Sequence, residues 1–242
     1  MKKLITVCLI LVTAFQAQAQ WWGGKGIKGN GNMTTIKRDV GSYDQVNVGG
    51  FFDVELVAGD EGTLTIEGES NLLEYIVTEV NGDALKIKVE KGKNLKPSNR
   101  MMIKITVPFR DLNEVTLAGS GDVTGRDIIQ ANDFNTSVAG SGDLMLKVEA
   151  NTVDSSVAGS GDLTLTGSTR DLEASVAGSG DIHAGNLDAA NVDARVAGSG
   201  DISVRCSENL KARVSGSGDI EYSGNPSKQD TKVSGSGDIS RN

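Results

Sequence analysis

Residues 155–182 read SSVAGSGDLTLTGSTRDLEASVAGSGDI, and this stretch holds the tetrapeptide Gly-Ser-Gly-Asp twice. The same tetrapeptide occurs seven times in the C-terminal half of the chain, at successive spacings of 21, 19, 19, 20, 18 and 19 residues. Its last residues form a column: Asp122, Asp143, Asp162, Asp181, Asp201, Asp219 and Asp238. A fixed motif with a slightly variable spacing predicts that insertions fall on the opposite side of each repeat.

Apolar and polar residues alternate on both sides of each tetrapeptide. Leu or Val stands five residues before every Asp, and Val, Leu or Ile follows it directly. This period of two predicts strands with one buried face that meet at a glycine turn. So short a unit cannot bury its apolar face alone, so the repeats must stack as parallel rungs about 4.8 Å apart. The predicted fold is all-β, a right-handed parallel β-solenoid with coils of about 19 residues over residues 112–242.

Residues 34–111 are also rich in alternating apolar residues, but they lack the tetrapeptide. Asn81-Gly82 lies between two such runs and predicts a β-hairpin. Residues 46–54 align without a gap on residues 115–123, which predicts a diverged coil of the same kind. Because Phe52 replaces the corner glycine there, we expect this coil to cap one end of the solenoid. The N-terminal part is thus predicted to contain less regular β coils and a hairpin.

The N-terminus has the layout of a secretory signal peptide. Two lysines precede a largely apolar run over residues 4–15, and Ala-Gln-Ala at residues 17–19 matches a cleavage site. We therefore expect residues 1–19 to be removed and the glycine-rich residues 20–33 to form a flexible arm. The expected location is outside the cytoplasm, in the periplasm, at the outer membrane surface or in the extracellular space.

The charge and the cysteine count restrict the possible partners. The chain has 24 basic and 32 acidic residues, a net charge of −8, which argues against binding to nucleic acid or to anionic membranes. No run after the signal peptide is long and apolar enough for a transmembrane segment. Cys206 would be the single cysteine of the mature chain, so no intramolecular disulfide can form.

The Asp column is the strongest candidate for chemistry. In one interpretation, each carboxylate is a structural cap that accepts hydrogen bonds from the backbone of its own turn. Alternatively, the seven carboxylates could form a cation ladder that binds calcium between coils, although one Asp and one Ser per coil supply few of the oxygens that calcium needs. We therefore predict no metal site and no cofactor, and calcium binding by the Asp column stays an alternative.

No residue pattern favours catalysis. His183 is the one histidine of the chain, and the equivalent position of the other repeats holds Thr, Met, Ser or Glu. We therefore expect a surface residue on a strand and assign no catalytic residue. A solenoid enzyme would need clustered carboxylates or basic groups that break the repeat on one face.

Four features together resemble a known family. They are the signal peptide, the coil at residues 52–56 (Phe-Asp-Val-Glu-Leu), the segment at residues 71–82 that ends in Asn-Gly, and the repeated Ala-Gly-Ser-Gly-Asp corners. Over roughly residues 40–242 the chain is similar to the putative auto-transporter adhesin, head GIN domain family. The resemblance implies an exported bacterial β-solenoid of the cell envelope.

Three functions are carried forward from the sequence. The first is a non-enzymatic structural or interaction protein of the cell envelope, adhesin-like, that binds an unknown protein or glycan of the cell surface through its solenoid faces. The second is a calcium-stabilised secreted repeat module, and the third is a carbohydrate-active solenoid enzyme. Homo-oligomers formed by end-to-end or face packing are a further expectation.

Overall fold

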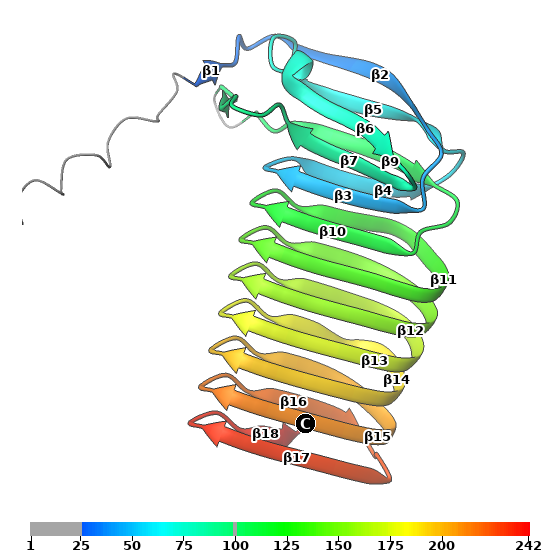
Figure 1. Cartoon of the computed structure of the whole chain (residues 1–242), viewed down its shortest axis with the longest axis vertical. Coiled ribbons are helices and arrows are strands. Elements are labelled where there is room, and N and C mark those ends of the chain that lie inside the picture. The colour runs from blue at the N-terminus through cyan, green and yellow to red at the C-terminus, as the bar shows by residue number, and fades with distance from the viewer. Residues whose placement is uncertain (1–25, 99–100) are drawn as a thin grey trace, which may run out of the picture.

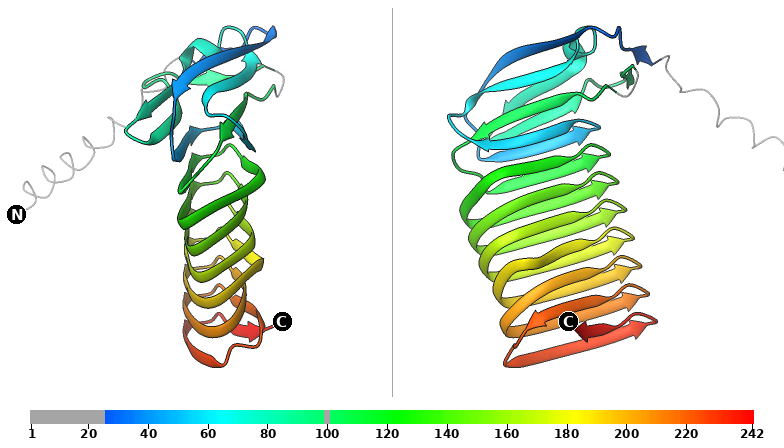
Figure 2. Two further views of the ribbon diagram at one scale, coloured as in Figure 1. Left: turned by 90° about the vertical axis from the view of Figure 1, so that its right-hand side faces the viewer. Right: turned by 180° about the vertical axis from the view of Figure 1, so that it is seen from behind.

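The computed structural model describes residues 26–98 and 101–242. The chain forms a flattened solenoid in which two sheets of parallel strands lie face to face (Figures 1 and 2). The coils wind in the predicted right-handed sense, so the expected all-β parallel solenoid is confirmed. The predicted signal peptide, residues 1–19, and residues 20–25 of the expected arm lie outside the described part of the chain.

The C-terminal half is a regular stack. Its strands are β10 (Glu114–Gly119), β11 (Val123–Gly140), β12 (Leu144–Gly159), β13 (Leu163–Gly178), β14 (Ile182–Gly198), β15 (Ile202–Gly216), β16 (Ile220–Gly224), β17 (Lys228–Gly235) and β18 (Ile239–Arg241). We call the sheet of β10, the second halves of β11–β15, and β17 the front sheet. The first halves of β11–β15, with β16 and β18, belong to the back sheet. The Gly-Ser-Gly-Asp turns form the first corner, and the strands β11–β15 bend without interruption through the second corner.

The variable spacing of the repeats is absorbed by irregularities in the strands. The pairing of β11 with β12 shifts register between Thr124 and Ile128, within the longest repeat. The pairing of β14 with β15 shifts between Ala184 and Asp188. Both shifts lie between the first corner and the second corner, so the tetrapeptides stay in register, as the sequence predicts.

The inward-facing side chains fill the narrow space between the two sheets. Val176 and Leu163 of β13 are at most 1% exposed, as are Leu144 and Val157 of β12. Small residues also face inward on the front sheet, where Ser155 is buried and its hydroxyl donates to the carbonyl of Glu173. Thin layers of this kind explain why so few aromatic residues are needed.

The N-terminal part adds two coils and a covering layer. The first coil consists of β3 (Gln45–Gly50) and β4 (Asp53–Ala58), the second of β7 (Ala84–Val89) and β9 (Lys104–Phe109). The covering layer contains β2 (Met33–Gly41), β5 (Gly62–Glu69) and β6 (Ile76–Asn81), with a 3-10 helix at Leu73–Tyr75. β6 and β7 form the predicted antiparallel hairpin at Asn81-Gly82.

The predicted alignment of residues 46–54 with residues 115–123 is the observed pairing. Val46 lies beside Val115, and Val54 lies beside Val123. The prediction that this coil caps the solenoid is wrong, because β7 and β9 stack beyond it. Antiparallel β2, β5 and β6 cover the end instead, since an antiparallel strand stops the parallel stacking.

Part of the expected flexible arm is packed against this covering layer. β1 (Ile27–Lys28) pairs with β8 (Leu95–Lys96), and the Gly31 N–H donates to Glu69 Oε1 at 2.6 Å. The arm prediction therefore does not hold for residues 26–33. Glycines carry no side-chain pattern, so the sequence gives no signal for this backbone pairing.

The last coil carries polar residues at three positions where the coil above carries apolar or aromatic ones. Gln229, Thr231 and Arg241 are aligned with Leu210, Ala212 and Tyr222 of the coil above. The Tyr222 hydroxyl lies 3.1 Å from Gln229 Oε1. Polar side chains at these positions match what a solvated terminal repeat requires.

Candidate functional site

Backbone hydrogen bonds hold the first corner together. In each coil the N–H groups of the Ser and of the second Gly donate to the carbonyl of the first Gly in the preceding coil, as Ser179 and Gly180 do to Gly159 at 2.8 and 3.0 Å. The first glycines have φ between +134° and +150°, a region that disfavours every other residue. A Cβ at Gly178 would lie 2.3 Å from the Gly159 carbonyl oxygen, so the close approach also requires glycine.

The Asp column continues this ladder with side chains. Asp181 Oδ1 accepts the backbone N–H of Asp201 at 2.7 Å, and Asp162 Oδ1 accepts that of Asp181 at 3.0 Å. The same contact recurs from Asp122 to Asp238. The donors thus belong to the next coil and not to the Asp's own turn, because the N–H groups of that turn already donate to the preceding coil.

His183 lies beside two carboxylates of the Asp column. It is exposed on the back sheet. One nitrogen of its ring and one carboxylate oxygen each of Asp162 and Asp181 lie within 4.8 Å of one another. Both carboxylates already accept backbone N–H groups. Cys206 is fully buried, and burial raises the pKa of its thiol, as expected for a structural residue.

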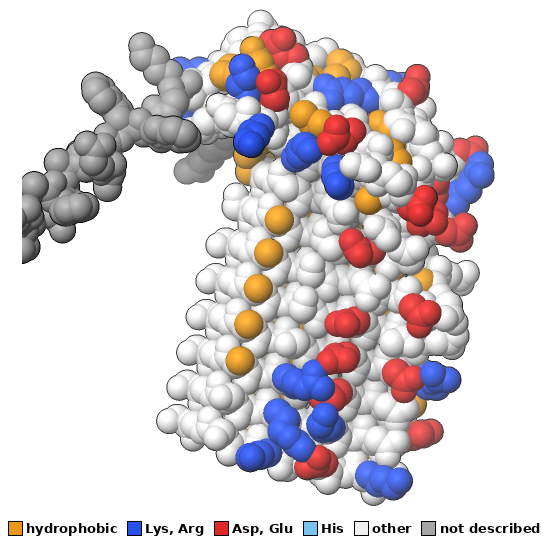
Figure 3. All heavy atoms as spheres, in the orientation of Figure 1, with side chains coloured by type: hydrophobic (Ala, Val, Ile, Leu, Met, Phe, Trp, Pro, Cys, Tyr) orange, Lys and Arg blue, Asp and Glu red, His pale blue; other side chains and the backbone are white. Residues whose placement is uncertain are grey.

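Side chains on the front sheet form a ladder of charges in the lower coils (Figure 3). Arg195 contacts Glu173 and lies 2.7 Å from Asp193, while Lys211 lies 2.8 Å from Asp193. Arg213 pairs with Asp230. Hydrogen bonding to Glu173 raises the pKa of Arg195. The four coils from β10 to β13 carry Thr116, Ser137, Ser156 and Ser175 where these lower coils carry Arg or Lys.

Beside this charged ladder runs a column of small side chains. It consists of Ala118, Ala139, Ala158, Ala177 and Ala197, followed by Ser215 and Ser234. Figure 3 shows its upper part as a line of orange methyl groups. A shallow hollow of about 400 Å³ lies here, with Arg195, Arg213 and Lys232 along one side.

The second corner is grooved along the axis of the solenoid. One section of about 610 Å³ lies over the upper coils, and a second of about 520 Å³ lies over the lower coils. The sections adjoin, because Asp133 of the first pairs with Thr152 of the second. The floor of the lower section is formed by Leu172, Val192 and Leu210, which are 2–3% exposed.

Carboxylates and carboxamides line both sections of this groove. In the upper section, Asn132 Oδ1 accepts from Asn151, a neighbour of the lining, at 2.7 Å. In the lower section, Asn191 Nδ2 donates to Asp171 Oδ1 at 2.7 Å. Asn209 in turn donates to Asn191. The hydrogen bonds from Asn191 and from Arg170 lower the pKa of Asp171, so its carboxyl stays ionised.

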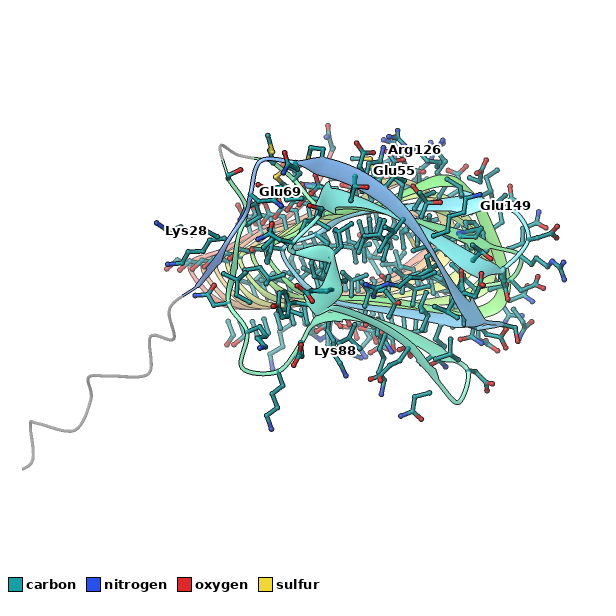
Figure 4. All side chains as sticks on the ribbon, turned by 90° about the horizontal axis from the view of Figure 1, so that it is seen from above. Lys28, Glu55, Glu69, Lys88, Arg126 and Glu149 are labelled. Atoms are coloured by element: carbon teal, nitrogen blue, oxygen red, sulfur yellow. The ribbon has the colours of Figure 1, made fainter. Side chains whose placement is uncertain are left out.

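The back sheet near the covering layer carries a separate cluster of charges. Glu55 lies 3.0 Å from Lys104 and 2.5 Å from Arg126, and these hydrogen bonds lower the pKa of Glu55. Viewed along the axis, Glu55 and Arg126 lie together on one side, Lys88 on the opposite side and Glu149 at the second corner (Figure 4). The cluster links β4, β9 and β11.

Sequence reasoning alone did not find the groove. The sequence does show Asp133, Asp171, Asn191 and Asn209 at equivalent positions of four repeats, ten residues before the corner Asp. That recurrence is the signal that could have identified it. A curved strand that turns these side chains outward along one line was not predictable from the spacing.

The chain resembles solved bacterial proteins over most of its length. A putative adhesin from Bacteroides fragilis covers 90% of this chain and 100% of its own, with a TM-score of 0.81 and 26% identity. A putative lipid binding protein from Parabacteroides distasonis has the same coverage, a TM-score of 0.74 and 30% identity. A putative adhesin from Parabacteroides distasonis, 24% identical with a TM-score of 0.70, shares the fold.

A comparison with curated proteins found no match. Within residues 26–98 and 101–242, no helix has the length and apolar character required to cross a bilayer. Residues 42–226 match the sequence pattern of a protein family. The matched residues include every coil of the stack down to β16. The chain therefore belongs to the putative auto-transporter adhesin, head GIN domain family.

Proposed function

We propose that the protein is an exported, non-enzymatic interaction module of the cell envelope that binds a surface partner through its front sheet and second corner. The first corner and the inward-facing residues are nearly identical from coil to coil, and they stabilise the stack. The outward positions of the front sheet and second corner change from coil to coil and carry the grooves and the charged ladder. This contrast is the observation that supports the proposal.

A lipid is a less suitable ligand for this chain. A relative is described as a putative lipid binding protein, but here the space between the sheets is filled by side chains such as Val176 and Leu163. The grooves at the surface have polar walls and a floor that is almost completely buried. An acyl chain would have to lie on this surface, beside carboxylates and carboxamides such as Asp171 and Asn191.

The proposal is tested with the fluorescently labelled chain from residue 20 onward and intact bacterial and animal cells. We expect saturable binding to at least one cell type, displaced by unlabelled protein. Glu173→Arg, which changes the charged ladder and a groove wall, should weaken binding at least about fivefold. Met145→Lys on the back sheet is the matched control, because Met145 is 53% exposed and far from both features.

Two results would contradict the proposal. One is binding that does not saturate on any cell type and equals that of an unrelated acidic protein. The other is an equal loss of binding in Glu173→Arg and Met145→Lys when thermal unfolding shows both variants to be folded.

A further inference from the structure

The side chains that line the groove of the second corner favour some classes of ligand over others. Its two sections contain seven carboxylates, seven carboxamides and two lysines. Asp171, Asn191 and Asn209 are typical wall residues, and Lys211 and Lys228 lie only at the lower end. The excess of negative charge disfavours nucleic acids, sulfated or uronate glycans and anionic lipid headgroups.

The groove also lacks what a peptide would need. Strands β12–β15, which form most of the floor and walls of its lower section, pair on both sides, so their backbone groups are not free to bind an added strand. Among the described lining strands of that section, β17 at the lower end pairs on one side, with β15. Leu172, Val192 and Leu210 are too deeply buried to form a pocket for an anchoring side chain. Recognition must therefore come from side-chain donors and acceptors.

Those side chains are held in place before any ligand arrives. Asn191 uses one amide hydrogen on Asp171 and accepts from Asn209, so its second amide hydrogen and remaining acceptor capacity are available. Because the hydrogen bonds among Asn209, Asn191 and Asp171 fix the rotamers of these side chains, little side-chain entropy is lost on binding. Fixed groups that both donate and accept match hydroxyl groups, which do the same.

The groove is long and repeats at the coil spacing. The coils from β10 to β17 place equivalent wall residues about 4.8 Å apart over roughly 30 Å. The sections adjoin at Asp133 and Thr152, so one extended ligand can follow both. A polymer of pyranose units offers hydroxyl groups at a comparable repeat.

We infer that the groove along the second corner binds an extended, neutral oligosaccharide that lies parallel to the solenoid axis. The inference rests on the proposed function and specifies its ligand class and site. Asp171, Asn191 and Asn209 contact hydroxyl groups of successive sugar units. The charged ladder of the front sheet borders this site on one side, where Glu173 and Asp193 belong to both.

The experiment is calorimetric titration of the chain from residue 20 onward with cellohexaose, maltohexaose, mannohexaose, xylohexaose and the anionic hexamer of galacturonate. We expect at least one neutral hexamer to bind, its dimer to bind at least tenfold more weakly, and the galacturonate hexamer to bind more weakly than the neutral one. Asn191→Ala and Asn209→Ala should each weaken binding about fivefold.

Met145→Ala is the matched control, since Met145 lies exposed on the back sheet outside the groove lining and should leave the affinity unchanged. Thermal unfolding of every variant separates lost binding from lost structure. Oxidation of cell-surface glycans with periodate should also remove the cell binding described above, and protease treatment should not.

Three outcomes would overturn the inference. They are binding of none of the neutral hexamers, preference for the galacturonate hexamer, and equal affinity of the Asn191→Ala variant. If cells treated with periodate still bind the protein while protease-treated cells do not, the interaction function stands and its ligand is a protein. If no cell type binds at all, the proposed function itself fails.

Discussion

The regular stack differs in its stabilising contacts from the N-terminal part with its covering layer, which we call the cap. In the stack, each coil from β11 to β15 repeats the same backbone contacts at the first corner, and the Asp column adds one side-chain contact per coil there. In the cap, single side chains hold different segments together. Glu69 accepts from Gly31 and Ser98, and Arg38 donates to the carbonyls of Leu73 and Ile76.

This difference shows what each region tolerates. The stack depends on close backbone approach, so a small added group at a corner disturbs two coils at once. The cap depends on polar contacts between segments far apart in sequence, so pH and single polar substitutions affect it more. Substitutions in the two regions can test this contrast.

The largest effect is expected for Gly178→Ala in the stack. The new Cβ would lie 2.3 Å from the Gly159 carbonyl, at φ +141°, so we expect the free energy of unfolding to fall by at least about 3 kcal/mol. Gly82→Ala in the cap hairpin has φ +64° and no atom within 4 Å, so its loss should be about 1 kcal/mol. Urea unfolding followed by circular dichroism compares the two, and equal losses would contradict the account.

A smaller effect is expected for Asp181 in the ladder. Asp181→Ala leaves the Asp201 N–H without its acceptor and should lower the free energy of unfolding by about 1–2 kcal/mol. Asp181→Asn keeps an oxygen in that place and should change it by less than about 0.5 kcal/mol. If Asn destabilises as much as Ala in the same urea unfolding, the negative charge itself would be needed.

The cap should respond to acid through Glu69. This side chain is 1% exposed, and burial raises its pKa. The hydrogen bonds from Ser98 and Gly31 outweigh burial, so the pKa of Glu69 lies below the ordinary value of a Glu carboxyl. A lowered folded pKa stabilises the cap above pH 4.5, and this stabilisation is lost as the pH falls through the folded pKa.

Amide exchange in β1 and β5 measures this effect between pH 3 and 6. In the unmodified protein, protection should fall on acidification by an amount on the order of 1 kcal/mol, while the stack stays protected. Glu69→Gln should lose protection near neutral pH and show a weaker pH dependence. Equal pH dependence in both proteins would assign the acid response to other carboxyls.

The smallest effect is expected on the charged ladder. Arg195→Ser introduces the residue type found one coil above, and the pairs that it removes are exposed, so stability should change by less than about 0.5 kcal/mol. A larger loss would mean that the ladder supports the fold, and its role in partner binding would then lose its main argument.

The sequence predicts the stack because one pattern is repeated. The aligned motifs around Val46 and Val115 predict two coils of one kind, which the structure pairs, and the hairpin at Asn81-Gly82 follows from turn chemistry. The covering layer was not predicted, since Glu69 and Ser98 meet through a buried contact that no local pattern encodes. The groove escaped prediction for a similar reason, because the bend of a continuous strand depends on packing between sheets.

The most direct test of the account is thermal unfolding of the chain from residue 20 onward, first with calcium and then with excess chelator. The account holds that the Asp column caps backbone N–H groups of the next coil and needs no metal. It predicts melting temperatures that agree within about 2 °C. A large rise in melting temperature with calcium, abolished in Asp181→Asn, would contradict it and favour a calcium-stabilised secreted module.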